Sequence, residues 1–240
     1  MDMAGHVTIW GDSVMRGVIY NEEKGRYTLL DENSADRASR RLGLTLNNRA
    51  RMGCTVTKGL AILKRDLCTE MACDAALIEF GGNDCDYDWA EIAARPEEEH
   101  QPRTSLALFS ASLKEMVEAV RMKGILPVMM TLPPIDAERY FRFFTRNDLN
   151  GENIRKWLGD VQHIYRWHER YNAAVTRVAR ECDCPLAGVR EAFLSERNVG
   201  ELLCADGIHP NRKGHALIES VLEGFGLSLE RQAGWAVSAC

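Results

Sequence analysis

The sequence lacks the features that mark exported, membrane or disordered proteins. No apolar run approaches the roughly 20 residues that cross a bilayer, and the longest, Ile125 to Leu132, has the length of a strand. The N-terminus passes from Met1 into an apolar strand pattern without the basic region and long apolar run of a signal peptide. We therefore expect a cytoplasmic protein with no membrane span.

No part of the chain has an excess of charge of one sign. The 35 acidic and 30 basic residues are interleaved and sum to −5. The densest basic stretches, residues 37–41 and Arg49 with Arg51, are short enough to be solvated helix or loop faces. Nucleic acid is therefore not an expected partner, and nothing in the charge pattern indicates an oligomeric state.

The eight cysteines show no pairing pattern. The closest two, Cys182 and Cys184, are separated by one residue, whereas structural zinc sites use repeated C-x-x-C pairs. In a chain without an export signal, dispersed cysteines are typical of reduced, buried thiols. The sequence thus predicts neither disulfides nor a metal site.

Short β-rich apolar runs alternate with amphipathic stretches along the chain. The predicted strands are His6 to Trp10, Thr45 to Asn48, Ala75 to Phe80, Ile125 to Thr131 and Pro185 to Val189. The predicted helices are Ser34 to Leu42, Thr55 to Leu67, Ser105 to Met122, Val161 to Cys182 and Asn211 to Phe225. Nearly continuous apolar strands indicate a parallel sheet covered by helices on both faces. We expect one α/β domain over residues 1–240, with about five parallel strands.

Residues 133–168 interrupt this alternation. The segment is too long for an ordinary connection, and it carries seven aromatic residues among many charges. Because it follows a predicted strand, we expect it at the carboxyl edge of the sheet, where open α/β folds bind ligands. Either an extra packing layer or a lid over a substrate would account for it.

Ser13 lies where the first strand meets the following helix, in the run Gly11-Asp12-Ser13-Val14. Serine is a favoured helix N-cap, so Ser13 alone has a structural explanation. It can equally be a nucleophile whose own N–H, at a helix N-terminus, faces a developing oxyanion.

Asp206-Gly207-Ile208-His209-Pro210, before the last predicted helix, places a carboxylate three residues ahead of a histidine. An Asp206 that accepts a bond from one imidazole nitrogen would leave the other free to take a serine proton. A turn stabilised by Asp206 beside a satisfied His209 is the structural alternative.

Two glycine-containing turns complete the set of strand-end motifs. In Gly81-Gly82-Asn83-Asp84, after the third strand, the Asn83 amide can donate to an oxyanion. Gly53, after the second strand, can add a backbone N–H. Plain turns are the alternative for both, since glycine adopts positive φ readily.

Four motifs, in their order along the chain, resemble the four blocks of the SGNH hydrolases, or GDSL-like lipase/acylhydrolase family. They are the Gly-Asp-Ser run at Ser13, Gly53, the Gly-x-Asn-Asp run at Asn83 and the Asp-x-x-His run at His209. The first block has Val14 where the family name has leucine. The resemblance spans nearly the whole chain. It implies a three-layer αβα sandwich of flavodoxin-like type, with no metal and no organic cofactor.

The resemblance also implies a Ser13–His209–Asp206 triad and an oxyanion hole formed by Ser13, Gly53 and Asn83. The expected activity is serine esterase or acylhydrolase, acting on a small-molecule carboxylic ester such as an O-acetyl group on a carbohydrate or another short acyl ester.

Two other functions are considered. A metallophosphoesterase would gather Asp12, Asn83, Asp84, His209 and His215 around a metal, but the Asp-x-His pairing of such enzymes is missing, because Val14 stands two residues after Asp12. A non-enzymatic phosphate- or nucleotide-binding module would use the turn from Gly11 to Gly17, which lacks the Gly-Lys-Ser/Thr ending of a nucleotide-binding loop.

Overall fold

A five-stranded parallel sheet runs through the middle of the computed structural model, which describes residues 5–233. Its strands are β1 (His6–Gly11), β4 (Thr45–Asn48), β5 (Ala75–Glu79), β6 (Leu126–Met130) and β7 (Leu186–Ala187), in the order β4-β1-β5-β6-β7. All the pairings in this sheet are parallel. The predicted set of strands is confirmed, although the last is shorter than expected because Val189 already begins a helix.

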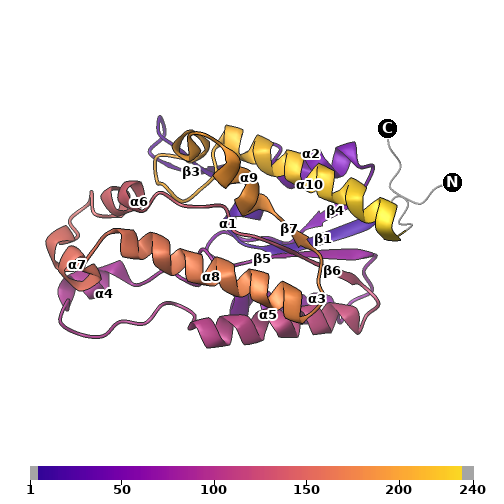
Figure 1. Cartoon of the computed structure of the whole chain (residues 1–240), viewed down its shortest axis with the longest axis horizontal. Coiled ribbons are helices and arrows are strands. Elements are labelled where there is room, and N and C mark those ends of the chain that lie inside the picture. The colour runs from indigo at the N-terminus through magenta and orange to yellow at the C-terminus, as the bar shows by residue number, and fades with distance from the viewer. Residues whose placement is uncertain (1–4, 234–240) are drawn as a thin grey trace.

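Helices cover both faces of the sheet, so the molecule has three layers (Figure 1). One layer contains α3 (Val56–Asp66), α5 (Leu106–Arg121) and α8 (Gln162–Glu181). The other contains α2 (Ser34–Arg41), α9 (Val189–Ser195) and α10 (Arg212–Ala233). The five predicted helices are present, and α10 extends beyond its predicted end.

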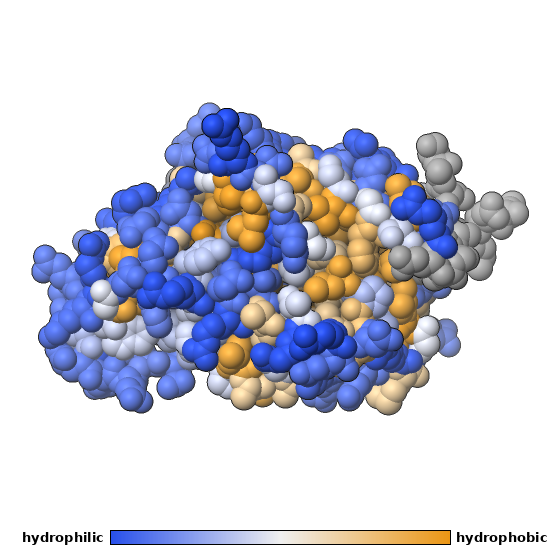
Figure 2. All heavy atoms as spheres, in the orientation of Figure 1, coloured by the Kyte–Doolittle hydropathy of each residue, from blue (hydrophilic) through white to orange (hydrophobic). Residues whose placement is uncertain are grey.

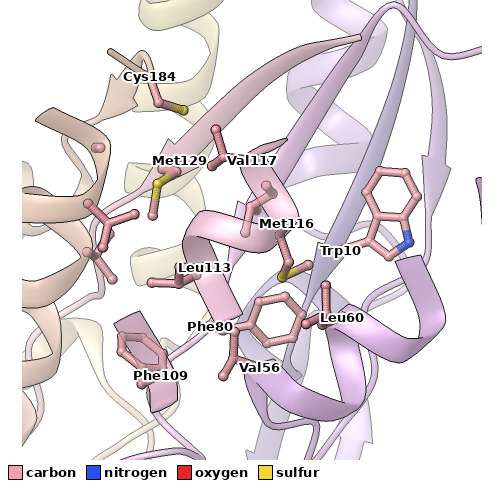
Figure 3. Close-up of a cluster of buried hydrophobic side chains, with 14 of the residues drawn as sticks. Trp10, Val56, Leu60, Phe80, Phe109, Leu113, Met116, Val117, Met129 and Cys184 are labelled. Atoms are coloured by element: carbon pink, nitrogen blue, oxygen red, sulfur yellow. The ribbon is translucent and has the colours of Figure 1, made fainter. Parts of the chain in front are cut away.

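The central strands β1, β5 and β6 are mostly apolar because consecutive residues enter two different cores. Trp10, Ile78 and Met129 belong to the cluster on the side of α3, α5 and α8. Their neighbours Ile9, Leu77 and Val128 belong to the cluster on the α2–α10 side. Figure 3 shows Trp10 and Met129 with residues of the first cluster such as Leu113 and Met116. Packing on the first side is close: a Cβ added to Gly59 of α3 would lie 2.2 Å from the Phe80 ring.

A second sheet, the antiparallel hairpin of β2 (Val18–Asn21) and β3 (Arg26–Leu29), was not predicted. Its strands have four residues each and are partly exposed, so they give no apolar run. The turn between them contains Gly25 with φ +60°. The hairpin follows the single-turn helix α1 (Ser13–Arg16) and thus lies beside the first strand-end motif.

Helices of the aromatic segment form a separate cluster at the end of the molecule that lies at the left in Figure 1. α6 (Ala137–Phe144), α7 (Gly151–Leu158) and the first turns of α8 pack with α4 (Trp89–Ala94). The surface of this end is mainly hydrophilic, while hydrophobic side chains gather between α8 and α10, where the edge strand β7 lies (Figure 2). A short 3₁₀ helix, Val199–Leu202, precedes α10. No helix in residues 5–233 has both the length and the apolarity needed to span a bilayer.

Candidate active site

Four loops that follow parallel strands meet at the carboxyl edge of the sheet. Ser13 follows β1, Gly53 lies in the loop after β4, Asn83 follows β5 and Pro133 follows β6. All four residues line one cavity of about 290 Å³, together with His209 from the loop before α10. This is the edge at which open α/β sheets hold their ligands.

Ser13, His209 and Asp206 form a continuous chain of hydrogen bonds. Nε2 of His209 lies 2.8 Å from Oγ of Ser13, and Nδ1 of His209 lies 2.5 Å from Oδ2 of Asp206. The other carboxylate oxygen of Asp206 accepts the backbone N–H groups of Ile208 and His209, both at 3.1 Å. All three side chains are buried. A hydroxyl, an imidazole and a carboxylate are thus aligned in the order that proton transfer from serine requires.

The Asp206 carboxylate is held in its ionised form. Burial alone would raise its pKa, but the hydrogen bond and charge of His209, with the two backbone N–H groups, lower the pKa of Asp206 below its usual value. An ionised Asp206 keeps a proton on Nδ1 of His209, which leaves Nε2 to accept the proton of Ser13.

The loop that carries Asp206 and His209 is fixed by contacts with α6. Gly207 has φ +76°, and a Cβ there would lie 2.7 Å from the backbone of Asp136 and of Tyr140. The Arg139 side chain donates to the backbone carbonyls of Gly200, Leu203 and Cys204. The aromatic segment therefore supports the loop of the histidine as well as the cavity wall.

The N-cap of α1 is Asp12, so the expectation that Ser13 could serve as a helix cap is wrong. Oδ1 of Asp12 accepts the N–H of Val14 at 2.9 Å, and Ser13 is the first helical residue. Gly17, with φ +80°, ends the helix after one turn. With the capping bond made by Asp12, the Ser13 hydroxyl faces His209.

Three groups around Ser13 can donate to an oxyanion. The N–H of Ser13 lies in the first turn of α1, where backbone donors have no partner within the helix. Nδ2 of Asn83 donates to Oδ2 of Asp12 at 3.1 Å, and the amide has a second N–H. Gly53 has φ +71° and open space where a Cβ would be. All three line the cavity.

Beneath these donors lies a buried pair of carboxyl groups that sequence reasoning did not single out. Oε2 of Glu79 accepts the backbone N–H of Asp12, and the two side chains share a hydrogen bond. Burial, and then the charge of Asp12, raise the pKa of Glu79 well above its usual value, and burial raises the pKa of Asp12 as well. A hydrogen bond between two carboxyl groups requires a proton, so the pair holds one between them. A glutamate in an otherwise apolar strand was the signal that could have identified it.

Asp84, from the same run as Asn83, links two of the loops. Its carboxylate accepts the N–H of Val56, the first residue of α3, at 2.9 and 3.1 Å. Burial raises the pKa of Asp84 to about 7. This contact holds the start of α3, and with it the loop of Gly53, next to Asn83.

Tyr27, from the unpredicted hairpin, contacts His209 and Asp206 and lines the same cavity. Its ring lies edge-on to His209, with centroids 5.2 Å apart. Burial raises the pKa of the Tyr27 hydroxyl, and the charge of Asp206 and a hydrogen bond to it raise that pKa further. No local motif marks this residue, because the hairpin reaches His209 only in the folded chain.

His215, considered above as a metal ligand, lies elsewhere. Its Nδ1 is 3.1 Å from the hydroxyl of Ser34, both side chains are fully buried, and burial lowers the pKa of His215 to about 4. Among the described residues, no three histidine, cysteine, aspartate or glutamate side chains are grouped so that they could hold a metal ion.

Comparisons with known proteins identify a family and structures with a similar fold. The model of the GDSL-like lipase/acylhydrolase family matches residues 9–217. The structure is similar to a lipase/acylhydrolase from Enterococcus faecalis, with 17% identity, a TM-score of 0.67 and coverage of 95% of this chain and 96% of that one. It is also similar to the psychrotrophic esterase EstA from Pseudoalteromonas sp., with 14% identity, a TM-score of 0.60 and coverage of 95% and 99%. No curated protein sequence matches the chain.

At these identities the structural neighbours establish the fold, whereas the family match, which spans most of the chain, establishes the class. The fold and the family together define an enzyme that hydrolyses ester bonds. The chain belongs to the GDSL-like lipase/acylhydrolase family.

Proposed function

We propose that this enzyme cleaves carboxylic esters of small molecules through an acyl-enzyme on Ser13. His209 takes the Ser13 proton through Nε2 while Oγ attacks the ester carbonyl, and Asp206 stabilises the imidazolium that results. The tetrahedral oxyanion accepts bonds from the N–H groups of Ser13 and Gly53 and from the Asn83 amide. His209 then protonates the leaving alcohol, and water repeats the cycle on the acyl-enzyme.

The observation that carries this proposal is the unbroken Ser13–His209–Asp206 chain in the wall of a cavity. A nucleophile hydrogen-bonded to a base that is itself oriented by a third group is the arrangement that activates a serine. Residues of the 133–168 segment also line this cavity. The acyl groups that we propose for it are short ones, including O-acetyl groups.

An organophosphorus serine reagent tests the assignment of the nucleophile. We expect it to label the native protein at Ser13, while Ser13→Ala gives no label and loses at least about 10³-fold in kcat on p-nitrophenyl acetate. Ser34→Ala is the matched control, because Ser34 also contacts a histidine but is fully buried. Hydrolysis by Ser13→Ala at the native rate would overturn the proposal.

A further inference from the structure

A second cavity, of about 470 Å³, adjoins the cavity of the triad, and Tyr27 and Met52 line both. The catalytic cavity extends from the triad to Ile164 and Trp167 of α8. The second cavity contains no residue of α8 and is formed by the end of α1, the hairpin and the loop after β4. Because Tyr27 contacts His209 and Met52 precedes Gly53, the two cavities meet at the triad end.

Three arginines and no acidic residue line the second cavity. Arg49 is neutralised by Asp66, whose two carboxylate oxygens accept its Nε and Nη2 groups at 3.0 and 2.7 Å. Arg16 and Arg51 are exposed, and neither guanidinium has a hydrogen-bond or ion-pair partner in the part of the chain that the structure describes. The cavity therefore presents two uncompensated positive charges that a ligand can reach.

Both of these arginines are carried by the segments that hold the reacting groups. Arg16 is the last residue of α1, the helix that begins with Ser13. The backbone N–H of Arg51 donates to the carbonyl of Gly11 at 3.1 Å, and the same loop continues into Gly53. The backbone of each arginine is thus fixed relative to the nucleophile and the proposed oxyanion donors.

Exposed apolar side chains lie in the same cavity as these charges. Leu29 and Met52, which are 51% and 52% exposed, are two of the six exposed large hydrophobic residues in the described chain. Both line the second cavity, and the buried residues Val18 and Ala50 complete its apolar wall. Apolar surface next to unpaired arginines fits a ligand with a hydrocarbon part that carries an anionic group.

The position of His209 indicates which part of an ester enters the second cavity. In the proposed mechanism Nε2 of His209 protonates the departing alcohol, so the alcohol oxygen lies beside this imidazole. Tyr27 packs against the same imidazole and lines both cavities. An alcohol that continues past Tyr27 therefore enters the second cavity, which leaves the α8 end of the catalytic cavity for the acyl group.

We propose that the second cavity is a subsite for the alcohol part of the substrate, in which Arg16 and Arg51 bind an anionic group, a carboxylate or a phosphate, on that alcohol. This inference rests on the proposed function. A guanidinium group binds either anion through paired N–H donors. The hydrocarbon part between the ester and the anion packs on Leu29 and Met52.

Acetate esters of phenols that carry an anionic group test the subsite. The anionic esters are 4-acetoxybenzoate, 4-acetoxyphenylacetate and 3-(4-acetoxyphenyl)propanoate, each paired with its neutral amide, and 4-acetoxyphenyl phosphate distinguishes a phosphate from a carboxylate. Each kcat/KM for acetate release is divided by the imidazole-catalysed rate of the same ester, which removes intrinsic reactivity. The native enzyme should prefer the anionic member of at least one pair by roughly tenfold, because each exposed ion pair contributes about threefold. The preference should decrease with added salt, which screens exposed charges.

Substitution of the two arginines tests their role. Arg16→Gln and Arg51→Gln should each lower the preference to about threefold, and the double variant should abolish it. Arg51→Lys keeps the charge and should keep most of the preference. Arg26→Gln is the matched control, since Arg26 is exposed in the same hairpin but lines neither cavity, and it should keep the native preference.

A pair with the charge on the acyl part completes the test: the p-nitrophenyl monoester of adipic acid against the p-nitrophenyl ester of adipic acid monoamide. The native enzyme should not prefer the anionic member of this pair. A preference for the anionic acyl group alone, or a preference for anionic alcohols that survives in the double variant, overturns the subsite. Hydrolysis of the neutral amides without any preference for the anionic alcohols also overturns it. If the native enzyme hydrolyses none of the esters, the proposed function itself fails.

Discussion

The two ends of the cavity are built on different principles. At the triad end, the polar side chains of Ser13, His209 and Asp206 all have hydrogen-bond partners within the protein. At the α8 end, the lining is mainly apolar and aromatic, with side chains such as Leu158, Ile164 and Trp167. Hydrogen bonds thus fix the reacting groups at one end, and packing shapes the cavity wall at the other.

Their support differs in the same way. The triad end is held in place by the strand ends and by hydrogen bonds between segments that are distant in the sequence. Examples are the bonds of Asp84 with Val56 and of Arg139 with Leu203. The α8 end is stabilised mainly by the packing of side chains between α4, α6, α7 and α8. Matched substitutions should therefore impair turnover at the first end and stability or selectivity at the second.

Asn83→Ala should have the largest effect among the variants that test this difference. It removes an oxyanion donor but leaves the triad intact, so kcat should fall by about 10²–10³ with little change in KM. Asn153→Ala, the same substitution in α7, removes only a hydrogen bond to the Ala93 carbonyl. It should lower the melting temperature while kcat stays near the native value. Steady-state kinetics and thermal unfolding check both, and equal losses of kcat would contradict the comparison.

Tyr27→Phe should have a smaller effect at the same end. It removes the hydroxyl next to Asp206 but keeps the ring against His209, so kcat should fall by about threefold to tenfold with KM unchanged. Tyr20→Phe, in the same hairpin, is the control, because Tyr20 packs against Tyr27 and Phe143 and does not line the cavity. A rise in KM alone would mean that Tyr27 contacts substrate instead of positioning the triad.

The same contrast explains what the sequence could predict. Strand ends with Ser13 or Asn83, and the Asp206-to-His209 turn, are local patterns whose meeting at one sheet edge follows from parallel topology. Tyr27, Trp167 and His168 carry no such pattern, because their positions depend on a hairpin of two short, half-exposed strands and on helix packing. The aromatic content of residues 133–168 indicated an additional structure near the cavity, but not which atoms would face it.

Glu79→Gln should have the smallest effect on turnover and separates a structural from a catalytic role for the buried pair. Because the pKa of Glu79 is raised in the folded state, its contribution to stability is complete below its unfolded value of about 4.5 and is lost as the pH rises through the folded value. An amide keeps the hydrogen bonds to Asp12 without titrating.

At neutral pH the Glu79→Gln variant should keep kcat near the native value, and its melting temperature should fall less between pH 5 and 9 than that of the native protein. Part of the slope will remain, since burial also raises the pKa of Asp12, and that of Asp84 to about 7. Glu152→Gln, at an exposed position of α7, should leave the native slope unchanged. An unchanged slope in Glu79→Gln would contradict a proton held by this carboxyl pair above the ordinary pKa of glutamate.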